Sequence, residues 1–425
     1  MVKLKEHKHS TENKPIENAL LPQTVYIPLS QHLGKICEPQ VKVGDIVLRA
    51  QKIASASANV YAPIHASISG KISAIREWPH PLLGRSKAIV IAGDGLDKAE
   101  ESLPKSKGEI ENLSADEIRS IVFAAGVVGM GGAAFPTHIK LNPPKPIDNL
   151  IINGAECEPY LTADNRLMIE KTKEIIAGIK LIVKCAGVKN VYIAIEDNKP
   201  EAIKAFQPEI EGTGYRVRVL KSEYPQGGEK QLIKAILKRE VPAGKLPFDI
   251  GVVVQNVATV FAIYEAVYLG KPLYERVITV TGDCLENPAN LLARIGTPIK
   301  DLISQCGPLR KEPQKIVFGG PMMGIAQYSA DTPVIKNTNG IILLSENQIK
   351  ETEQAFCIRC SRCVEACPLG LMPCLISQAC EKGRWDLAKA YGCMECMECG
   401  LCNYVCPRAR NIVQSIKDAK TRMPK

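Results

Sequence analysis

The sequence has 425 residues, which is enough for roughly two to four domains with a buried core. Hydrophobic residues make up 45% of it and charged residues 23%, proportions that are ordinary for a soluble protein. A disulfide framework is excluded in a chain of this length, because eleven of the sixteen cysteines lie in the last seventy residues. They indicate a metallocluster in a reducing compartment.

The formal net charge of +9 predicts acidic or anionic partners, although solubility alone accounts for it equally well. The N-terminus is rich in lysine and has no apolar core of a signal peptide. No apolar stretch reaches the roughly eighteen residues of a membrane span. We therefore expect any membrane association to be peripheral.

Residues 25–96 alternate apolar and polar side chains between turn signals, a pattern that predicts short β-strands. The segment resembles the barrel-sandwich fold of biotinyl and lipoyl carriers. Those carriers present a modifiable lysine on the hairpin between the two halves, whereas here that hairpin, residues 54–59, has none. We therefore predict a structural or docking barrel. We interpret His32 and His65 in it as ordinary hydrogen-bonded side chains rather than ligands.

Two less structured segments flank this barrel in our interpretation. Residues 1–24 are expected to form an N-terminal tail, and the polar residues 97–112 a linker. The linker is followed by Ser114 and Glu117, which form a capping box and predict a helix that ends near Gly126.

Gly126–Lys140 is a glycine-rich loop that ends on a lysine. With four glycines in its first seven residues, its backbone suits close approach to a phosphate and donation of N–H groups to it. A tight packing turn would use the same residues, so this alternative stays open. The loop is not a Rossmann fingerprint, because it follows a helix rather than a strand.

Strand-like and helical patterns alternate through the rest of residues 113–272 and predict a Rossmann-like, doubly wound α/β domain. Ligands of such domains bind at the carboxyl ends of the strands. Polar segments follow three strand ends and are candidate walls of a cofactor crevice, although Asn and Gly are also ordinary turn residues. The expected strands are 150–153, 191–196, 216–220 and 249–255, with a helix from 258 to 270, and the polar segments are 153–159, 223–230 and 255–259.

The tail, residues 345–425, contains the spacing C-x2-C-x2-C-x3-C-P twice. This is the spacing of bacterial two-cluster ferredoxins, in which each cluster takes its fourth cysteine from the other run. It predicts an α-helical, ferredoxin-like domain with two [4Fe–4S] clusters. The predicted ligands of the first cluster are Cys357, Cys360, Cys363 and Cys406, and those of the second are Cys396, Cys399, Cys402 and Cys367.

A pair of zinc sites is the alternative, since four thiolates also suit zinc. Zinc modules usually arrange their ligands as two separated C-x2-C pairs, so the spacing favours clusters. Cys393 could start a shifted run, but only the run that begins at Cys396 ends in C-P, and we leave Cys393 out. Cys374 and Cys380 are expected on a helix between the two runs, as core residues.

Several motifs together carry a resemblance to known families. The segments 129–140, 153–158, 224–229 and 256–259 are similar, in this order, to the FMN- and NADH-binding segments of the flavoprotein subunit of respiratory complex I. The runs GMGGAAFPTHIKL and NGAECEPYLTADNR, the N-terminal barrel and the double cysteine run resemble the RnfC subunits of the Rnf ion-translocating electron-transport complexes. This second resemblance covers nearly the whole chain, whereas the complex I subunit has one cluster motif and lacks the barrel.

The resemblance implies roles for individual residues. The backbone of Gly129, Gly131 and Gly132 would line the nucleotide site, and Lys140 would neutralise the phosphate of non-covalent FMN. Phe135 and Glu158 would face the nicotinamide of NAD(H). The residues implied around the isoalloxazine ring and ribityl chain are Asn153, Glu156, Tyr224, Glu229 and Asn256.

Two further points concern the resemblance itself. Residues 273–335 resemble the β-grasp-type (SLBB-like) module that both families place before the clusters, with an architectural role. The complex I family has the acidic segment NGDEGEP where this chain has NGAECEP from Asn153 to Pro159, so that one carboxylate near the flavin is missing. The way in which the complex I family tunes the flavin's redox potential therefore cannot be transferred directly to this chain.

The implied activity is that of a translocase subunit that exchanges hydride between NAD(H) and FMN. Single electrons would pass through the two clusters to or from ferredoxin and the membrane subunits, at the cytoplasmic face of the cell membrane. We expect no catalytic side chain and no nucleic-acid partner. One alternative is a soluble cobalamin reductase, disfavoured because that group has its barrel after the clusters. The other is a non-enzymatic, ferredoxin-like electron adapter, against which the intact glycine loop and Lys140 argue.

Overall fold

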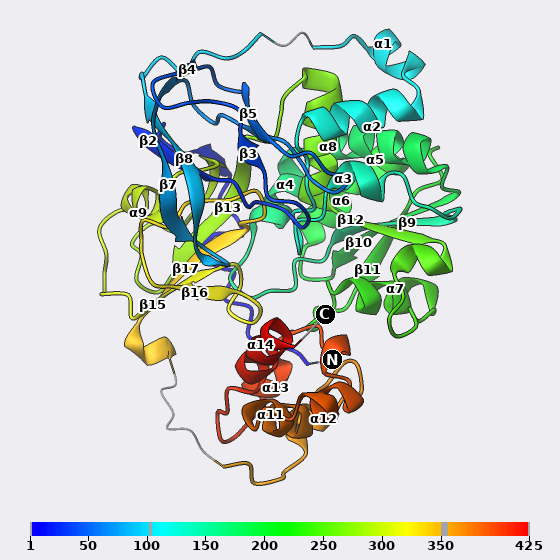
Figure 1. Ribbon diagram of the computed structural model, residues 1–425. Coiled ribbons are helices and arrows are strands. Elements are labelled where there is room, and N and C mark those ends of the chain that lie inside the picture. Colours follow the sequence, from blue (N-terminus) through cyan, green and yellow to red (C-terminus); the bar gives the residue numbers. More distant parts are fainter. Residues whose placement is uncertain (1, 102–103, 350–355, 424–425) are drawn as a thin grey trace.

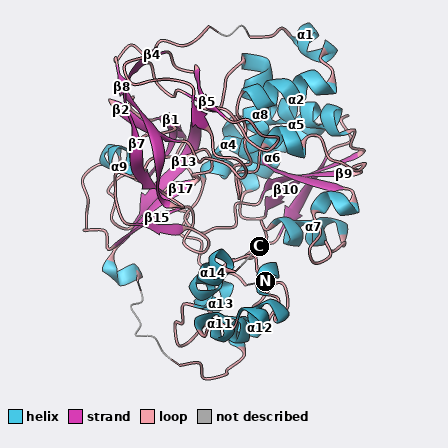
Figure 2. Cartoon of the chain, viewed as in Figure 1, coloured by secondary structure: helices cyan, strands magenta, loops and turns pink. Residues whose placement is uncertain are grey.

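The computed structural model describes residues 2–101, 104–349 and 356–423. A barrel-like sheet structure, an α/β domain and a mixed sheet pack together as one body, and a small helical domain formed by the C-terminal residues lies beside it (Figures 1 and 2). No helix in these three described ranges is both long and apolar enough to cross a membrane.

The N-terminal domain consists of two small antiparallel sheets around one apolar core. The alternating pattern of residues 24–28 places Val25 and Ile27 in this core, where both are fully buried. One sheet has the order β2-β8-β7-β4 and the other β3-β5-β6. The strands are β2 (Thr24–Pro28), β3 (Glu38–Pro39), β4 (Ile46–Val47), β5 (Lys52–Ser55), β6 (Ile64–His65), β7 (Gly70–His80) and β8 (Gly84–Gly93).

Parts of the expected tail and of the expected linker are regular structure. β1 (Ile16–Asn18) pairs in parallel with β14 (Ala289–Arg294) of the mixed sheet, so the segment 1–24 is not a free tail in its described part. α1 (Lys107–Asn112) lies inside the expected linker. It begins at Ser106, whose side chain forms a capping box with Glu109, a signal that the sequence analysis missed.

The α/β domain has a four-stranded parallel sheet in the order β11-β10-β9-β12. Alternate residues along each strand face opposite layers: Ile152 and Ile193 face one core, and Ile151 and Tyr192 the other. The strands are β9 (Asn149–Gly154), β10 (Asn190–Glu196), β11 (Arg216–Leu220) and β12 (Val252–Asn256).

Helices cover both faces of this sheet, as expected for a doubly wound domain. One layer contains α2 (Ala115–Ala124), α4 (Ala163–Glu170), α5 (Thr172–Ala186), α6 (Pro200–Ile210) and α8 (Val257–Leu269), and the other α7 (Glu229–Leu237). The short helix α3 (Thr137–Lys140) ends the glycine loop.

Most predicted elements of this domain agree with the structure. The capping box of Ser114 and Glu117 begins α2, and α8 ends at Gly270 in the left-handed conformation. The strand expected at 249–255 is wrong at its start, because residues 247–250 form the 3-10 helix η1 (Pro247–Ile250). Gly251 (φ +72°) then reverses the chain direction before β12 begins.

The mixed sheet that follows has six strands in the order β1-β14-β13-β17-β15-β16. It contains β13 (Glu275–Gly282), β15 (Lys315–Phe318), β16 (Ile325–Gln327) and β17 (Gly340–Leu344), with helix α9 (Ile299–Gln305) and the 3-10 helix η2 (Glu346–Gln348) beside them. The edge strand β1 comes from the N-terminal segment, so this sheet joins that segment to residues 275–344.

The C-terminal domain is helical, as predicted. Its core lies between α11 and α14, and the short helices α10 and α13 lie within the first and the second cysteine run respectively. The elements are α10 (Arg362–Glu365), α11 (Pro373–Glu381), α12 (Trp385–Ala390), η3 (Cys393–Glu395), α13 (Leu401–Tyr404) and α14 (Ile412–Arg422). Cys374 and Cys380 lie on α11, as expected.

Candidate functional site: a glycine loop joined to two cysteine sets

The glycine loop is held open by its own backbone and by α8. Gly129 N donates to the carbonyl oxygen of Phe135 (2.9 Å), and Met130 N donates to Thr259 Oγ1 (2.9 Å). The backbone N–H groups of residues 131–135 donate to no other described residue. Gly131, Gly132 and Ala133 are exposed, so their free N–H groups fit a phosphate, whereas Ala134 is buried.

Gly131 packs directly on Asn256, the residue that caps α8. A Cβ atom at Gly131 would lie 2.9 Å from the Cβ of Asn256, so only glycine allows this close approach. Asn256 Oδ1 accepts hydrogen bonds from the N–H groups of Ala258 and Thr259, and its Nδ2 donates to Asp164 Oδ2 (2.6 Å). The loop and the third polar segment therefore form one wall.

Asp164 is a half-buried carboxylate that the sequence analysis included only as part of a motif. Its backbone N–H donates to Glu156 Oε1 (2.7 Å), which brings two carboxyl groups close together. Burial, together with the nearby charge of Glu156, raises the pKa of Asp164 to about 6.

Three other residues implied around the flavin lie at the ends of regular elements: Lys140 ends α3, Asn153 is near the end of β9 and Glu229 begins α7. Lys140 Nζ forms an ion pair with Glu229 Oε1 (2.9 Å), and both side chains are partly exposed. Asn153 Nδ2 donates to the carbonyl oxygen of Gly227 (2.9 Å) and joins the first two polar segments. A phosphate would therefore compete with Glu229 for Lys140.

Glu158 connects the α/β domain to the mixed sheet. Its carboxylate accepts hydrogen bonds from the N–H groups of Met322 (3.1 Å) and Met323 (2.8 Å), and burial raises its pKa. Gly320 permits the contact, since a Cβ atom there would lie 2.0 Å from Glu158 Oε2. Phe135 is half-buried. Its backbone carbonyl oxygen accepts the hydrogen bond from Gly129 N.

Lys8 is a contributor that the sequence analysis did not identify. Its ammonium group is buried and donates to the carbonyl oxygens of Glu156 (2.8 Å), Glu158 (3.0 Å) and Leu161. Lys8 thereby fixes the loop that carries two of the implied site residues. The N-terminus is rich in lysine, and nothing in its sequence distinguishes this one.

Tyr224 joins the α/β domain to the C-terminal domain. Its Oη donates to the carbonyl oxygen of Cys399 (2.7 Å) and lies 3.4 Å from Glu158 Oε1. Tyr224, Leu4, Cys399 and Leu401 form a buried apolar cluster. One tyrosine therefore contacts both a residue implied at the nicotinamide side and a predicted cluster ligand.

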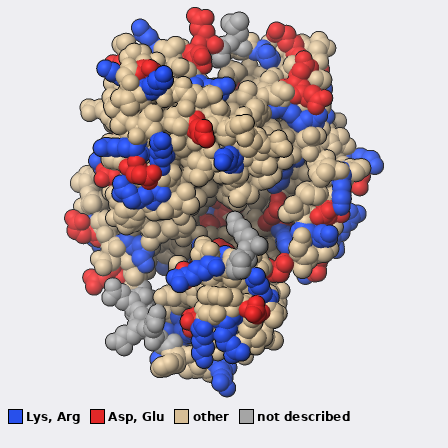
Figure 3. Space-filling model, viewed as in Figure 1, with Lys and Arg blue, Asp and Glu red and all other residues tan. Residues whose placement is uncertain are grey.

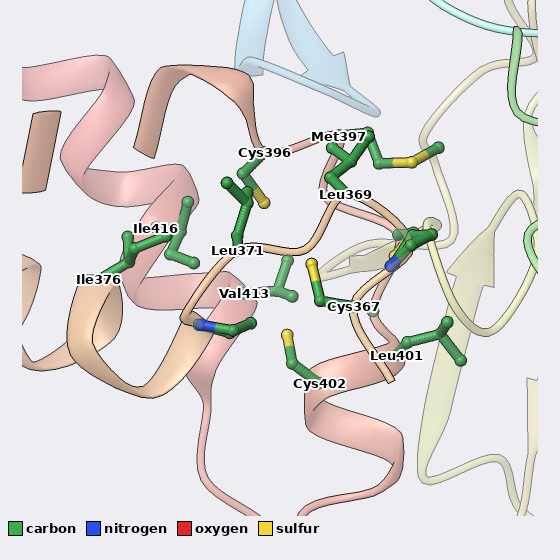
Figure 4. Close-up of a pocket in the computed structure, with 14 residues that line it drawn as sticks. Cys367, Leu369, Leu371, Ile376, Cys396, Met397, Leu401, Cys402, Val413 and Ile416 are labelled. Atoms are coloured by element: carbon green, nitrogen blue, oxygen red, sulfur yellow. The ribbon is translucent and has the colours of Figure 1, made fainter. Parts of the chain in front are cut away.

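Four of the predicted ligands line one cavity next to this contact. We call Cys367, Cys396, Cys399 and Cys402 the inner cysteine set. The sulfur atoms of Cys367, Cys396 and Cys402 point into the space between them (Figure 4), and the surrounding wall is apolar. The fourth cysteine of this set, Cys367, thus comes from the first cysteine run, although it is distant in sequence from the other three.

The other four line a second cavity of the C-terminal domain. We call Cys357, Cys360, Cys363 and Cys406 the outer cysteine set, of which Cys360 is exposed. Arg359 and Arg408 lie at its rim, and basic side chains gather on the C-terminal domain in Figure 3. Each set combines three cysteines of one run with one of the other, which is the donor arrangement of two cubane clusters.

Three cysteines of the C-terminal domain, Cys374, Cys380 and Cys393, belong to neither set. Cys374 borders the cavity of the outer set, whereas Cys380 and Cys393 are buried and hydrogen-bonded to each other. No three His, Cys, Asp or Glu side chains in the described part of the chain converge on a single metal-ion position. The two sets instead surround open cavities.

Three family descriptions match consecutive parts of the chain. "RnfC Barrel sandwich hybrid domain" matches residues 2–96, "Nuo51 FMN-binding domain" residues 122–265 and "SLBB domain" residues 277–326. These matches confirm the predicted multidomain α/β architecture with a barrel-sandwich domain at its N-terminus and an FMN-binding domain in the middle.

Among solved structures, the chain is similar to one of an NAD+-reducing [NiFe]-hydrogenase in the air-oxidized state. The TM-score is 0.51 at 18% identity, over 73% of this chain and 65% of that one. At this identity the similarity concerns the fold alone.

Similar curated proteins extend over nearly the whole chain. The RnfC-type subunit of the proton-translocating ferredoxin:NAD(+) oxidoreductase complex of Clostridium ljungdahlii is 48% identical over 98% of this chain and 92% of that protein. Its Na(+)-translocating counterpart of Acetobacterium woodii is 45% identical over 97% and 94%. The corresponding protein of Vibrio cholerae is longer, and the chain spans 48% of it. The chain therefore belongs to the RnfC family, a subunit family of the Rnf-type, ion-translocating ferredoxin:NAD+ oxidoreductase complexes.

Proposed function

We propose that this chain exchanges hydride between NAD(H) and a non-covalently bound FMN and passes single electrons through two [4Fe–4S] clusters. The hydrogen bond from Tyr224 Oη to the carbonyl oxygen of Cys399 carries this proposal, because it joins the implied flavin crevice to the inner cysteine set. As an RnfC subunit, the chain would exchange electrons with the membrane subunits of the complex and, through them, with ferredoxin.

The residues present fit FMN at the edge of the parallel sheet. The free N–H groups of the glycine loop and the ammonium group of Lys140 suit its phosphate. Asn153 and Asn256 are held in place by their own hydrogen bonds to Gly227 and Asp164. Together with Glu156, Tyr224 and Glu229, they would border the isoalloxazine ring and ribityl chain. The backbone of Gly129, Gly131 and Gly132 supports the nucleotide.

The two cysteine sets fit [4Fe–4S] clusters, since each offers four thiols around one cavity and takes the fourth from the other run. A bound flavin supplies the conversion between the two-electron hydride of NAD(H) and the one-electron steps of iron–sulfur clusters. Glu158 and Phe135 would orient the nicotinamide, and Tyr224 would fix the distance from the crevice to Cys399. No side chain acts as a nucleophile.

Charge and exposure support an order along this path. The inner set is next to Tyr224, whereas the outer set includes the exposed Cys360 and has Arg359 and Arg408 at its rim. Electrons would therefore pass between the flavin and the inner set, then between the inner and the outer set, and leave or enter at the basic surface. We also propose a peripheral position on the cytoplasmic face of the membrane; membership of a membrane-complex family supports the peripheral association.

The test is anaerobic reconstitution of the full chain with iron, sulfide and FMN, followed by titration with NADH under optical and EPR detection. We expect loss of the oxidised flavin absorbance together with reduced-cluster signals, at about eight iron atoms per chain. A Lys140→Ala variant should retain less FMN. Clusters that stay oxidised in a chain that retains no FMN would overturn the proposal in favour of a passive electron adapter.

A further inference from the structure

Lys336 is a buried lysine that none of the roles proposed so far uses. It lies between β16 and β17 of the mixed sheet and is 1% exposed. Its ammonium group donates to the carbonyl oxygens of Pro63 (2.6 Å) and Gly126 (2.7 Å). Pro63 belongs to the barrel and Gly126 begins the glycine loop, so this one side chain joins the mixed sheet to two other domains.

The charge of Lys336 has no carboxylate partner at ion-pair distance among the residues that the structure describes. The titratable groups around it are His32, Cys37 and His65 of the barrel. Burial lowers the pKa of Lys336 to about 7, so holding a charge at this place costs free energy. An apolar side chain of similar length would avoid this cost, and stability alone therefore does not account for the lysine.

The contact between Lys336 and the loop requires a glycine at position 126. Gly126 follows α2 with a φ of +66°, in the left-handed region. A Cβ atom there would lie 2.3 Å from the carbonyl oxygen of Pro63 and 2.8 Å from Lys336 Nζ. The barrel, the lysine and the loop thus meet without room for a side chain, so a shift of any one of them would move the start of the loop.

The backbone of Lys336 is itself held on both sides. Its N–H donates to Oε1 of the buried Gln31 (3.1 Å), a residue of the barrel. Its carbonyl oxygen accepts a hydrogen bond from Nη1 of the buried Arg276 (2.7 Å), on β13. The ammonium group therefore reaches the loop from a fixed support.

The next residue, Asn337, holds the same loop further along. Its Nδ2 donates to the carbonyl oxygen of Gly132 (3.2 Å), and Leu33 N of the barrel donates to the carbonyl oxygen of Ala134 (3.2 Å). The loop is thus bound at its start, in its interior and at its end from outside the α/β domain. All these bonds use carbonyl groups of the loop, and they leave the exposed N–H groups of residues 131–133 free.

We propose that Lys336 and Asn337 are positioning residues for FMN. They fix the carbonyl groups of the glycine loop, so that the free N–H groups of the loop stay directed at the phosphate. The inference rests on the proposed function, in which this loop and Lys140 hold the phosphate of FMN. Neither side chain needs to contact the flavin, because each acts through the backbone of the loop. The mixed sheet then has a direct effect on flavin affinity.

The test uses the full chain reconstituted with iron and sulfide, and its affinity for FMN is measured by fluorescence titration. Lys336→Met removes the ammonium group at similar length, and Asn337→Ala is a milder variant at a partly exposed position. Leu302→Ala, in the apolar core of the mixed sheet, lowers the melting temperature without a contact to the loop. Asn112→Ala, at the exposed end of α1, controls for the loss of a surface amide.

We expect FMN to bind about tenfold more weakly to Lys336→Met and about threefold more weakly to Asn337→Ala, because two hydrogen bonds and one hydrogen bond to the loop are lost. Leu302→Ala and Asn112→Ala should bind FMN like the wild type well below their melting temperatures. All four variants should retain the iron content of the wild type, and Asn337→Ala keeps the test decisive if Lys336→Met does not fold.

Two results would contradict this account at different levels. Wild-type affinity for FMN in Lys336→Met or in Asn337→Ala would overturn the positioning role of that residue, and an equal loss of affinity in Leu302→Ala would overturn it for both. A wild type that binds no FMN would overturn the proposed function itself.

Discussion

The phenolic oxygen of Tyr224 donates a 2.7 Å hydrogen bond to the carbonyl oxygen of Cys399, across the boundary between the α/β domain and the C-terminal domain. The side chain is 1% exposed, so the bond is shielded from water. Leu4 and Leu401 pack around it and exclude solvent further. A fixed contact of this kind keeps the distance between the flavin crevice and the inner cysteine set constant.

Tyr224→Phe should disturb this connection while leaving the ring in place. The unpaired carbonyl group of Cys399 should cost about 1–3 kcal/mol of stability, because it is buried. We expect flavin reduction by NADH to proceed at the wild-type rate and the following cluster reduction to be slower, as measured by stopped-flow absorbance. Tyr264→Phe, on α8, is the matched control and should change neither step. Equal cluster reduction in both variants would show that the bond has no role in positioning.

Lys8→Met should destabilise the loop from Glu156 to Leu161. The carbonyl groups of Glu156, Glu158 and Leu161 would lose their hydrogen-bond donor. One unsatisfied buried carbonyl group costs about 1–3 kcal/mol of the free energy of unfolding, which already exceeds the effect of a typical surface substitution. We expect a lower melting temperature and a lower FMN content per chain. Lys5→Met, at an exposed position three residues earlier, provides the comparison and should resemble the wild type. If both variants retain FMN equally, the amine of Lys8 does not support the site.

Alanine variants test the crossed cysteine sets. Cys406→Ala should remove the outer cluster and Cys367→Ala the inner one, so that iron falls from about eight to about four atoms per chain in each. Cys393→Ala should retain all the iron, because Cys393 borders neither cavity. Iron analysis and EPR measure both effects. Loss of a cluster in Cys393→Ala would mean that the second run starts one cysteine earlier.

Asp164→Asn should stabilise the protein in a pH-dependent manner. The pKa of Asp164 is raised to about 6 from its ordinary value near 4, so the folded state binds the extra proton between these values and stability falls as the pH rises through them. An asparagine at position 164 does not ionise, so the variant does not lose stability as the pH rises. Its side-chain oxygen can still accept the hydrogen bond from Asn256 Nδ2. We expect a gain of about 1–3 kcal/mol at pH 7.5 and a smaller one at pH 5, measured by thermal unfolding. An equal gain at both values would contradict this origin.

Much of this organisation could be predicted from the sequence because it depends on local signals. Strands 191–196 and 216–220 and the capping box at Ser114 each depend on a few neighbouring residues, and each is found where it was expected. The cysteine spacing is also a local signal; its eight cysteines line two cavities in sets of four, and their role as cluster ligands stays a prediction. The order of the domains followed from long motifs, and the family matches confirm it.

What the sequence did not reveal depends on contacts between distant residues. Lys8 binds carbonyl groups about 150 positions away, and β1 completes a sheet whose other strands begin at residue 275. Lys336 reaches Pro63 and Gly126 only because the mixed sheet packs on the barrel and on the glycine loop. No periodicity or spacing records such contacts, since they arise when the domains assemble.

In the proposed path, electrons from NADH reach the outer cysteine set through the inner one. The most direct test is anaerobic stopped-flow mixing of NADH with reconstituted wild type and with Cys367→Ala, with freeze-quench EPR to follow each cluster. In the wild type, flavin and both clusters should be reduced in sequence. In Cys367→Ala the flavin should still be reduced while the outer cluster stays oxidised. Reduction of the outer cluster at the wild-type rate without the inner one would contradict the proposed path.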